Sequence, residues 1–190
     1  LQAALGLSAS ESGTALLAFL LGTVAGATIS GRLTARIVHY KRIALVGAAL
    51  AAVSLAVLAF VAGEISLGPL EALTALIGFG TGMTFPVCTV SVQNAVDRAH
   101  LGVATGVLTF LRSLGGALGV AIVGAVALSY GLPLAGEGGQ VSMPGGSADL
   151  FAVIFIAAAI FMVVSFVALL AMPEKPLHGG IAERPTMAPE

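Results

Sequence analysis

One charged side chain, Arg112, lies inside a long apolar stretch, and its type and position could do chemistry. It follows Gly102, where this stretch begins, by ten residues, so a helix would carry it about 15 Å along its axis. If the stretch spans a bilayer, a charge at that depth costs about 2.5–3.5 kcal/mol on insertion scales. No Asp or Glu of the sequence lies at a similar depth. Its partner is therefore sequence outside this chain, backbone carbonyls, water in a cavity or a bound anion. Arg112 is either a structural residue that caps carbonyls or a direct participant in the movement of a substrate or a proton.

The neighbours of Arg112 on a helical wheel are small or polar. Its face holds Thr105, Thr109, Gly116 and Gly119, and the opposite face holds Val107, Leu111, Leu114, Leu118 and Ile122. Residues three and four apart share a face of a helix. We therefore expect the Arg112 face to meet protein or water and the opposite face to meet lipid.

The preceding apolar stretch, 70–92, carries a second candidate set. Phe85 belongs to a stripe with Glu71, Thr74, Gly78, Thr81, Cys88 and Val92, and Gln93 and Asn94 follow at its end. Pro86 removes one helical hydrogen bond and should bend or loosen a helix there. Phe85 could contact an apolar ligand, although ordinary packing between helices explains the same stripe.

Glycines recur at helical spacing in three stretches. In lipid, small residues let helix backbones approach closely. We predict packing faces at Gly22 and Gly26, at Gly78 and Gly82, and at Gly115, Gly116 and Gly119. Their clustering favours a tightly packed bundle over separate membrane anchors.

The elements that must position these residues are membrane-spanning helices. The chain is 58% apolar and 9% charged, whereas soluble domains have about 45–50% and about 25%. A bilayer core of about 30 Å needs about 20 apolar residues in helix. Five stretches meet this length: 13–30, 43–61, 70–92, 102–128 and 150–172. Because helices satisfy their own backbone groups in lipid, the predicted fold class is an all-α integral membrane bundle over residues 1–176, followed by a disordered tail over 177–190.

Basic residues predict the orientation of the chain. Seven of the eight Lys and Arg residues fall in alternate connections or the tail, and the eighth is Arg112. The positive-inside rule places those connections and the C-terminus in the cytoplasm of a multi-pass protein of the plasma or inner membrane. The net charge of −1 gives no reason to expect nucleic-acid binding. The three histidines show no metal-ligand spacing, and nothing in the sequence suggests a cofactor or an enzyme.

Two segments resemble a known family. GFGTGMTFPVCTVSVQNAV (78–96) and DRAHLGVATGVLTFLRSLGGALGVAIVGAV (97–126) look like the C-terminal half of major facilitator superfamily transporters, and most resemble the fourteen-helix drug:proton antiporter branch. Gly31, Leu33 and Arg36 match that superfamily's cytoplasmic loop motif, whose Asp position is Ala35 here. The resemblance implies that the five spans are the tenth to fourteenth helices and that earlier helices of the same protein are missing partners.

The same resemblance implies a function for the whole protein. It would be an alternating-access carrier that exports drug-like small molecules in exchange for protons, with the protonatable acids in its N-terminal half. One alternative is a carrier of a metabolite such as a sugar or organic acid. Another is a non-transporting, truncated membrane scaffold. The few polar groups on the predicted inner faces favour apolar cargo.

Overall fold

The computed structural model describes residues 9–34, 40–61, 66–129 and 147–172. Within these ranges the chain forms helices and no strands. They are α2 (Ala9–Thr34), α3 (Tyr40–Val61), α4 (Leu67–Ala95), α5 (Leu101–Ser129) and α6 (Ser147–Ala171), with a short 3-10 helix η1 (Arg98–His100) before α5. All five α-helices are long and apolar enough to cross a membrane. The predicted all-α fold with five spans is confirmed, and the predicted tail over 177–190 lies outside the described residues.

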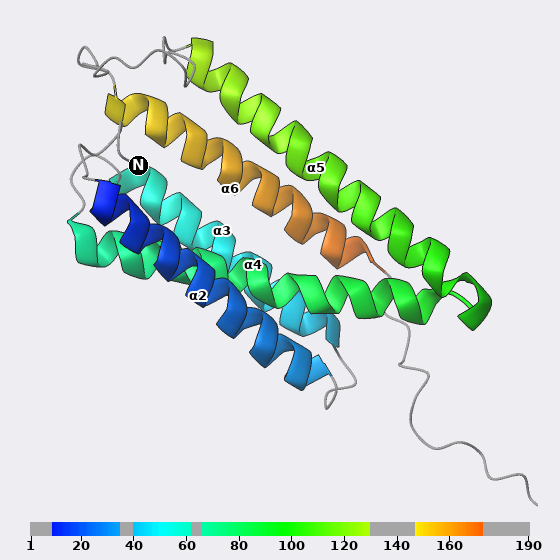
Figure 1. Ribbon diagram of the computed structural model, residues 1–190. Coiled ribbons are helices and arrows are strands. Elements are labelled where there is room, and N and C mark those ends of the chain that lie inside the picture. Colours follow the sequence, from blue (N-terminus) through cyan, green and yellow to red (C-terminus); the bar gives the residue numbers. More distant parts are fainter. Residues whose placement is uncertain (1–8, 35–39, 62–65, 130–146, 173–190) are drawn as a thin grey trace, which may run out of the picture.

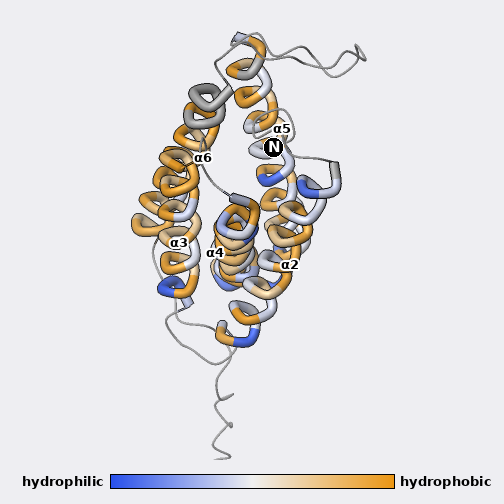
Figure 2. Tube along the Cα trace, turned by 90° about the vertical axis from the view of Figure 1, so that its left-hand side faces the viewer, coloured by the Kyte–Doolittle hydropathy of each residue, from blue (hydrophilic) through white to orange (hydrophobic). Residues whose placement is uncertain are grey.

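Helix α4 lies at the centre of the bundle. Helices α2 and α3 pack on opposite sides of it, and α6 packs on α3, while α5 meets the others only sparsely. Neighbours in sequence are therefore not always neighbours in space, since α2 packs mainly on α4 and little on α3. Figure 2 shows α4 between the α2 side and the α3–α6 side.

Backbone contact explains the close approach of α2 to α4. A Cβ added at Gly22 or Gly26 would overlap the carbonyl oxygens of Ala75 and Phe79, respectively. A Cβ at Gly78 or Gly82 would overlap backbone oxygens of α2 in the same way. Only hydrogen fits at these positions, so the two helices touch through their main chains.

One buried hydroxyl links the same two helices. Ser30 Oγ donates to the carbonyl oxygen of Met83 over 2.7 Å, and Ser30 has no exposed surface. Other hydroxyls of α2, such as those of Thr23 and Thr28, donate instead to carbonyls of their own helix. The Ser30 bond therefore adds a side-chain link to the backbone contact between α2 and α4.

Two apolar clusters join α4 to α3 and α6. One contains Tyr40, Ile43, Ala44, Ala48, Met83, Val87 and Leu169, and the other contains Leu55, Leu58, Leu70 and Ile77. Between them Gly47 and Gly80 meet backbone to backbone, since a Cβ at Gly47 would lie 2.6 Å from the Gly80 oxygen. Small residues thus allow close packing on both sides of α4.

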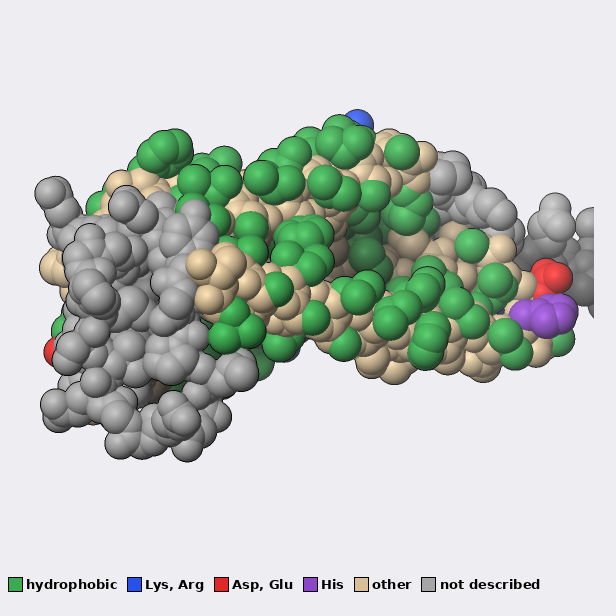
Figure 3. All heavy atoms as spheres, turned by 90° about the horizontal axis from the view of Figure 1, so that it is seen from above, with side chains coloured by type: hydrophobic (Ala, Val, Ile, Leu, Met, Phe, Trp, Pro, Cys, Tyr) green, Lys and Arg blue, Asp and Glu red, His purple; other side chains and the backbone are tan. Residues whose placement is uncertain are grey.

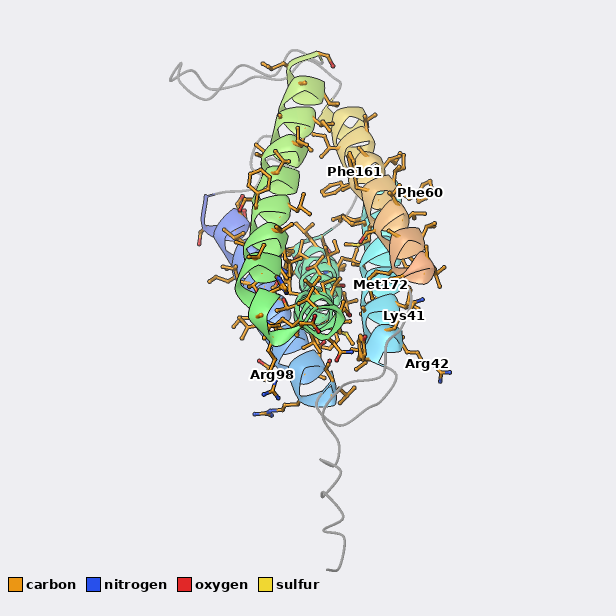
Figure 4. The ribbon with its side chains drawn as sticks, turned by 90° about the vertical axis from the view of Figure 1, so that its right-hand side faces the viewer. Lys41, Arg42, Phe60, Arg98, Phe161 and Met172 are labelled. Carbon is orange, nitrogen blue, oxygen red and sulfur yellow. The ribbon has the colours of Figure 1, made fainter. Side chains whose placement is uncertain are left out.

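Lys41 connects the beginning of α3 to the end of α6. Its Nζ donates to the carbonyl oxygens of Leu170 and Met172 over 2.7 and 2.6 Å. The last carbonyls of a helix lack partners within the helix, and a cation stabilises that end of the helix dipole. Figure 4 shows Lys41 beside Met172, with Arg42 pointing away.

The outer surface of the helices is apolar. Large apolar side chains remain exposed along α2, α3, α5 and α6, and Phe60 is 86% exposed. In Figure 3, hydrophobic side chains are spread along the described helices in view, and the few charged ones lie near the margins. This surface suits lipid or further helices, because an apolar surface of this extent is rare on soluble proteins.

Candidate functional site

Arg112 and Phe85 meet between α4 and α5. The guanidinium carbon of Arg112 lies 4.8 Å from the centroid of the Phe85 ring, within the range of a cation–π contact. Arg112 is exposed and Phe85 is 43% exposed. The pair therefore presents a fixed positive charge and part of an aromatic ring on an accessible surface.

The chain places this pair at one depth. Phe85 precedes the end of α4 at Ala95 by ten residues, and Arg112 follows the start of α5 at Leu101 by eleven. At 1.5 Å per residue both lie about 15–17 Å from the turn that joins the two helices. Two consecutive, antiparallel helices thus bring a cation and a ring together well inside the apolar zone.

Helices α4 and α5 meet near η1 and diverge beyond it (Figure 1). Pro86, next to Phe85, lies inside α4 and leaves the carbonyl of Gly82 without its usual helical donor. Side-chain tips rather than backbones make the contact at Arg112. Such a contact can open with a change of side-chain rotamers, without separation of packed helices.

Thr105 and Thr109 lie on the same helix as Arg112 but find no partner across the helix interface in the described chain. Thr109 Oγ1 donates to the Thr105 carbonyl over 2.9 Å and is exposed. This bond lies within one turn of α5. Thr109 is therefore exposed one turn before the arginine, whereas Thr105 is half-buried.

Gln93 and Asn94 belong to a separate hollow. They line a depression of about 640 Å³ together with Val90, Ala95, Val96, Asp97, Arg98 and Leu101. Gln93 lies eight residues after Phe85, about 12 Å along the helix. The structure thus does not unite these two amides with Arg112, and it places them at the charged end of the bundle.

An apolar groove lies beside part of the predicted lipid-facing side of α5. Val107 and Leu111, expected to face lipid, line an open groove of about 360 Å³ with Val92 of α4 and with Val96, which follows α4. Both side chains remain more than half exposed, so the expectation that this side of α5 meets lipid stays a prediction. Leu114 and Leu118, further along α5, are exposed.

The remaining predicted residues lie apart from the pair. A Cβ at Gly115, Gly116 or Gly119 meets no described atom within 4 Å, so their packing role stays a prediction. Gly31 and Leu33 lie in the last turn of α2 rather than in a loop, because the helix continues to Thr34. Arg36 lies outside the described residues.

The contact between Arg112 and Phe85 is the feature that the sequence interpretation missed. Both residues were candidates, but the arginine's partner was sought among acids, carbonyls, water and anions. Residues that lie equally far from the turn between two antiparallel helices lie at equal depth. The similar distances of Phe85 and Arg112 from the α4–α5 turn could therefore have predicted their contact.

The sequence pattern of the Major Facilitator Superfamily matches residues 1–188. The chain belongs to this superfamily. It is 29% identical over 132 residues to a "Tetracycline resistance determinant" of Streptomyces rimosus, an alignment that covers 70% of this chain and 38% of that protein. It is 31% identical over 126 residues to the "Multidrug transporter protein MdtP" of Bacillus subtilis, covering 66% and 23%. An "Aspyridones efflux protein" of Neocamarosporium betae is 30% identical over 121 residues, covering 64% and 22%.

Membership of the Major Facilitator Superfamily makes this a multi-pass membrane protein related to drug efflux pumps. The aligned part corresponds to 38% or less of the length of these three curated relatives. No solved structure matches the chain.

Proposed function

We propose that this chain is the C-terminal part of a secondary active transporter that exports drug-like small molecules in exchange for protons. Family membership and the printed names of three relatives, which concern tetracycline resistance, multidrug transport and aspyridone efflux, support this proposal. Transport would proceed by alternating access, with the site near the bilayer midplane between two helical halves. The earlier helices of the same protein would supply the second half and the protonatable acids.

The observation that carries the proposal is Arg112 stacked on Phe85 within the apolar zone. Ionisable residues inside membranes face a bundle interior or a water-filled cavity and mark substrate or ion pathways. We place Arg112, Thr109, Thr105 and Phe85 on the wall of the substrate path. Gln93 and Asn94 would lie where that path reaches the cytoplasm.

The charges support a cytoplasmic C-terminus in the plasma or inner membrane. Lys41, Arg42 and Arg98 lie at one end of the bundle (Figure 4). Basic residues prefer the cytoplasmic side. The proposed orientation puts the hollow beside Gln93 on that side as well.

A transport assay with Arg112→Ala in the full-length protein tests the proposal. Everted membrane vesicles would be energised with a proton gradient, and drug movement would be followed with and without a protonophore. We expect proton-dependent drug movement in the wild type and a loss of at least about tenfold in the variant, equal to about 1.4 kcal/mol in the barrier. Arg42→Ala, at an exposed position on α3, is the matched control.

Two outcomes would count against it. Unchanged transport by Arg112→Ala at equal expression would remove Arg112 from the path. A full-length protein that moves no drug under a proton gradient would favour a non-transporting role.

A further inference from the structure

We infer that the path beside Arg112 selects organic anions and disfavours organic cations. This inference rests on the proposed transport function and names its substrate class. It comes from two features of the pair: none of the acids in the described part of the chain lies at the depth of Arg112, and the ring of Phe85 is already occupied by a cation.

The first feature is the lack of a nearby negative charge. The described acids are Glu11 in the first turn of α2, Glu71 in the second turn of α4, Asp97 beside η1 and Asp149 in the first turn of α6. Each lies near the end of a helix, whereas Arg112 is eleven residues inside α5. Charges attract more strongly where the dielectric constant is low. A carboxylate or sulfonate on a substrate would therefore gain a favourable partner at Arg112.

The second feature is the use of the aromatic face. Organic cations bind proteins through the faces of aromatic rings. The guanidinium of Arg112 already lies over the Phe85 ring at 4.8 Å. A cationic drug would have to displace a tethered cation and then remain beside it, so the pair repels the ligands that a free ring would attract.

The accessible hydroxyl of Thr109 gives a position for measuring the local charge. Thr109 is exposed and lies one turn before Arg112. We would introduce Thr109→Cys into the full-length transporter with Cys88→Ser and with any other cysteines replaced. The rate of thiol modification would be measured with an anionic reagent, methanethiosulfonate ethylsulfonate, and a cationic one, methanethiosulfonate ethyltrimethylammonium.

We expect the modification rate with the anionic reagent, divided by that with the cationic reagent, to fall at least about tenfold when Arg112→Gln is added. Arg112→Lys keeps the positive charge and should leave this ratio unchanged. Free cysteine gives the intrinsic ratio of the two reagents. An unchanged ratio in Arg112→Gln would overturn the inference. So would a cysteine that reacts with neither reagent, because an anion could not reach such a position either.

Inhibition of drug export gives the second measurement. Fluorescein and rhodamine 6G share a xanthene scaffold and differ in charge, the first an anion and the second a cation. We expect fluorescein to inhibit the wild type at least about tenfold more strongly, and Arg112→Gln to lose this preference. If fluorescein is no better an inhibitor than rhodamine 6G, the inference is wrong.

The two proposals can fail separately. A transporter that loses export with Arg112→Ala but shows no charge preference keeps the proposed function and loses the anion selectivity. A protein that transports no drug at all overturns both.

Discussion

Helix α4 makes two contacts of opposite kinds, one with α2 and one with α5. On the α2 side, backbone meets backbone through glycines at which a Cβ would overlap a carbonyl oxygen. On the α5 side, near mid-helix, a guanidinium meets a ring 4.8 Å away, and α5 has few other contacts there. The first contact cannot slide or open without separating main chains, whereas the second can rearrange by rotation of two side chains. Helix α4 thus combines a fixed seam, the backbone contact with α2 at Gly78 and Gly82, with a mobile contact. The mobile contact is the side-chain contact between Phe85 and Arg112 of α5.

The fixed seam should be the most sensitive to added volume. Gly78→Val would push branched carbons into the backbone of α2 at Phe19, and overpacking costs about 1–3 kcal/mol or more. We expect the free energy of unfolding of the full-length protein to fall by about 3 kcal/mol, measured by denaturant titration in detergent. Gly106→Val is the matched control, because a Cβ there meets no described atom. Equal losses in both variants would break the distinction between the two contacts.

The mobile contact should be weaker and measurable as a coupling. Phe85→Leu keeps an apolar side chain but removes the ring, and a cation–π contact is worth about 0.5–1 kcal/mol at an exposed site and about 2 kcal/mol when desolvated. A double-mutant cycle of Phe85→Leu and Arg112→Gln should give a coupling free energy of about 1–2 kcal/mol. Unfolding in detergent is the measurement. A coupling near zero would mean that the two side chains act independently.

Lys41 offers a smaller effect away from both contacts. Lys41→Met removes the donor to the last carbonyls of α6, at a cost of about 1 kcal/mol. We expect faster amide hydrogen exchange in the last turn of α6 and no change in α2. The control is Arg42→Met, because Arg42 is exposed and points away from α6 (Figure 4). The prediction fails if both variants speed exchange equally.

The smallest effect should come from the single hydroxyl in the seam. Ser30→Ala removes the bond to the Met83 carbonyl, and hydrogen bonds between membrane helices average about 0.6 kcal/mol. Thr28→Val is the control, since Thr28 donates within its own helix. We expect a loss of about 0.6 kcal/mol from the first substitution and less from the second. A loss above about 2 kcal/mol would mean that the hydroxyl, rather than the glycines, holds the seam.

The five spans followed from the sequence because the length of an apolar run is set by the bilayer alone. The pairing of helices did not, because glycine spacing marks a face without naming its partner: Gly22 could have met any small-residue face, and it meets α4 at Ala75. For the site, the sequence indicated Arg112 and Phe85 separately. Their contact depends on how α4 and α5 cross at η1.

The bond from Lys41 to the end of α6 also orders the assembly of the chain. Its two acceptors lie 129 and 131 residues further along the sequence, so the contact cannot form until α6 has been synthesised and inserted. Helices α2, α3 and α4 can meet earlier, through contacts that involve only one another. Closure of the α3–α6 end is therefore a later event in biogenesis than the meeting of α2, α3 and α4.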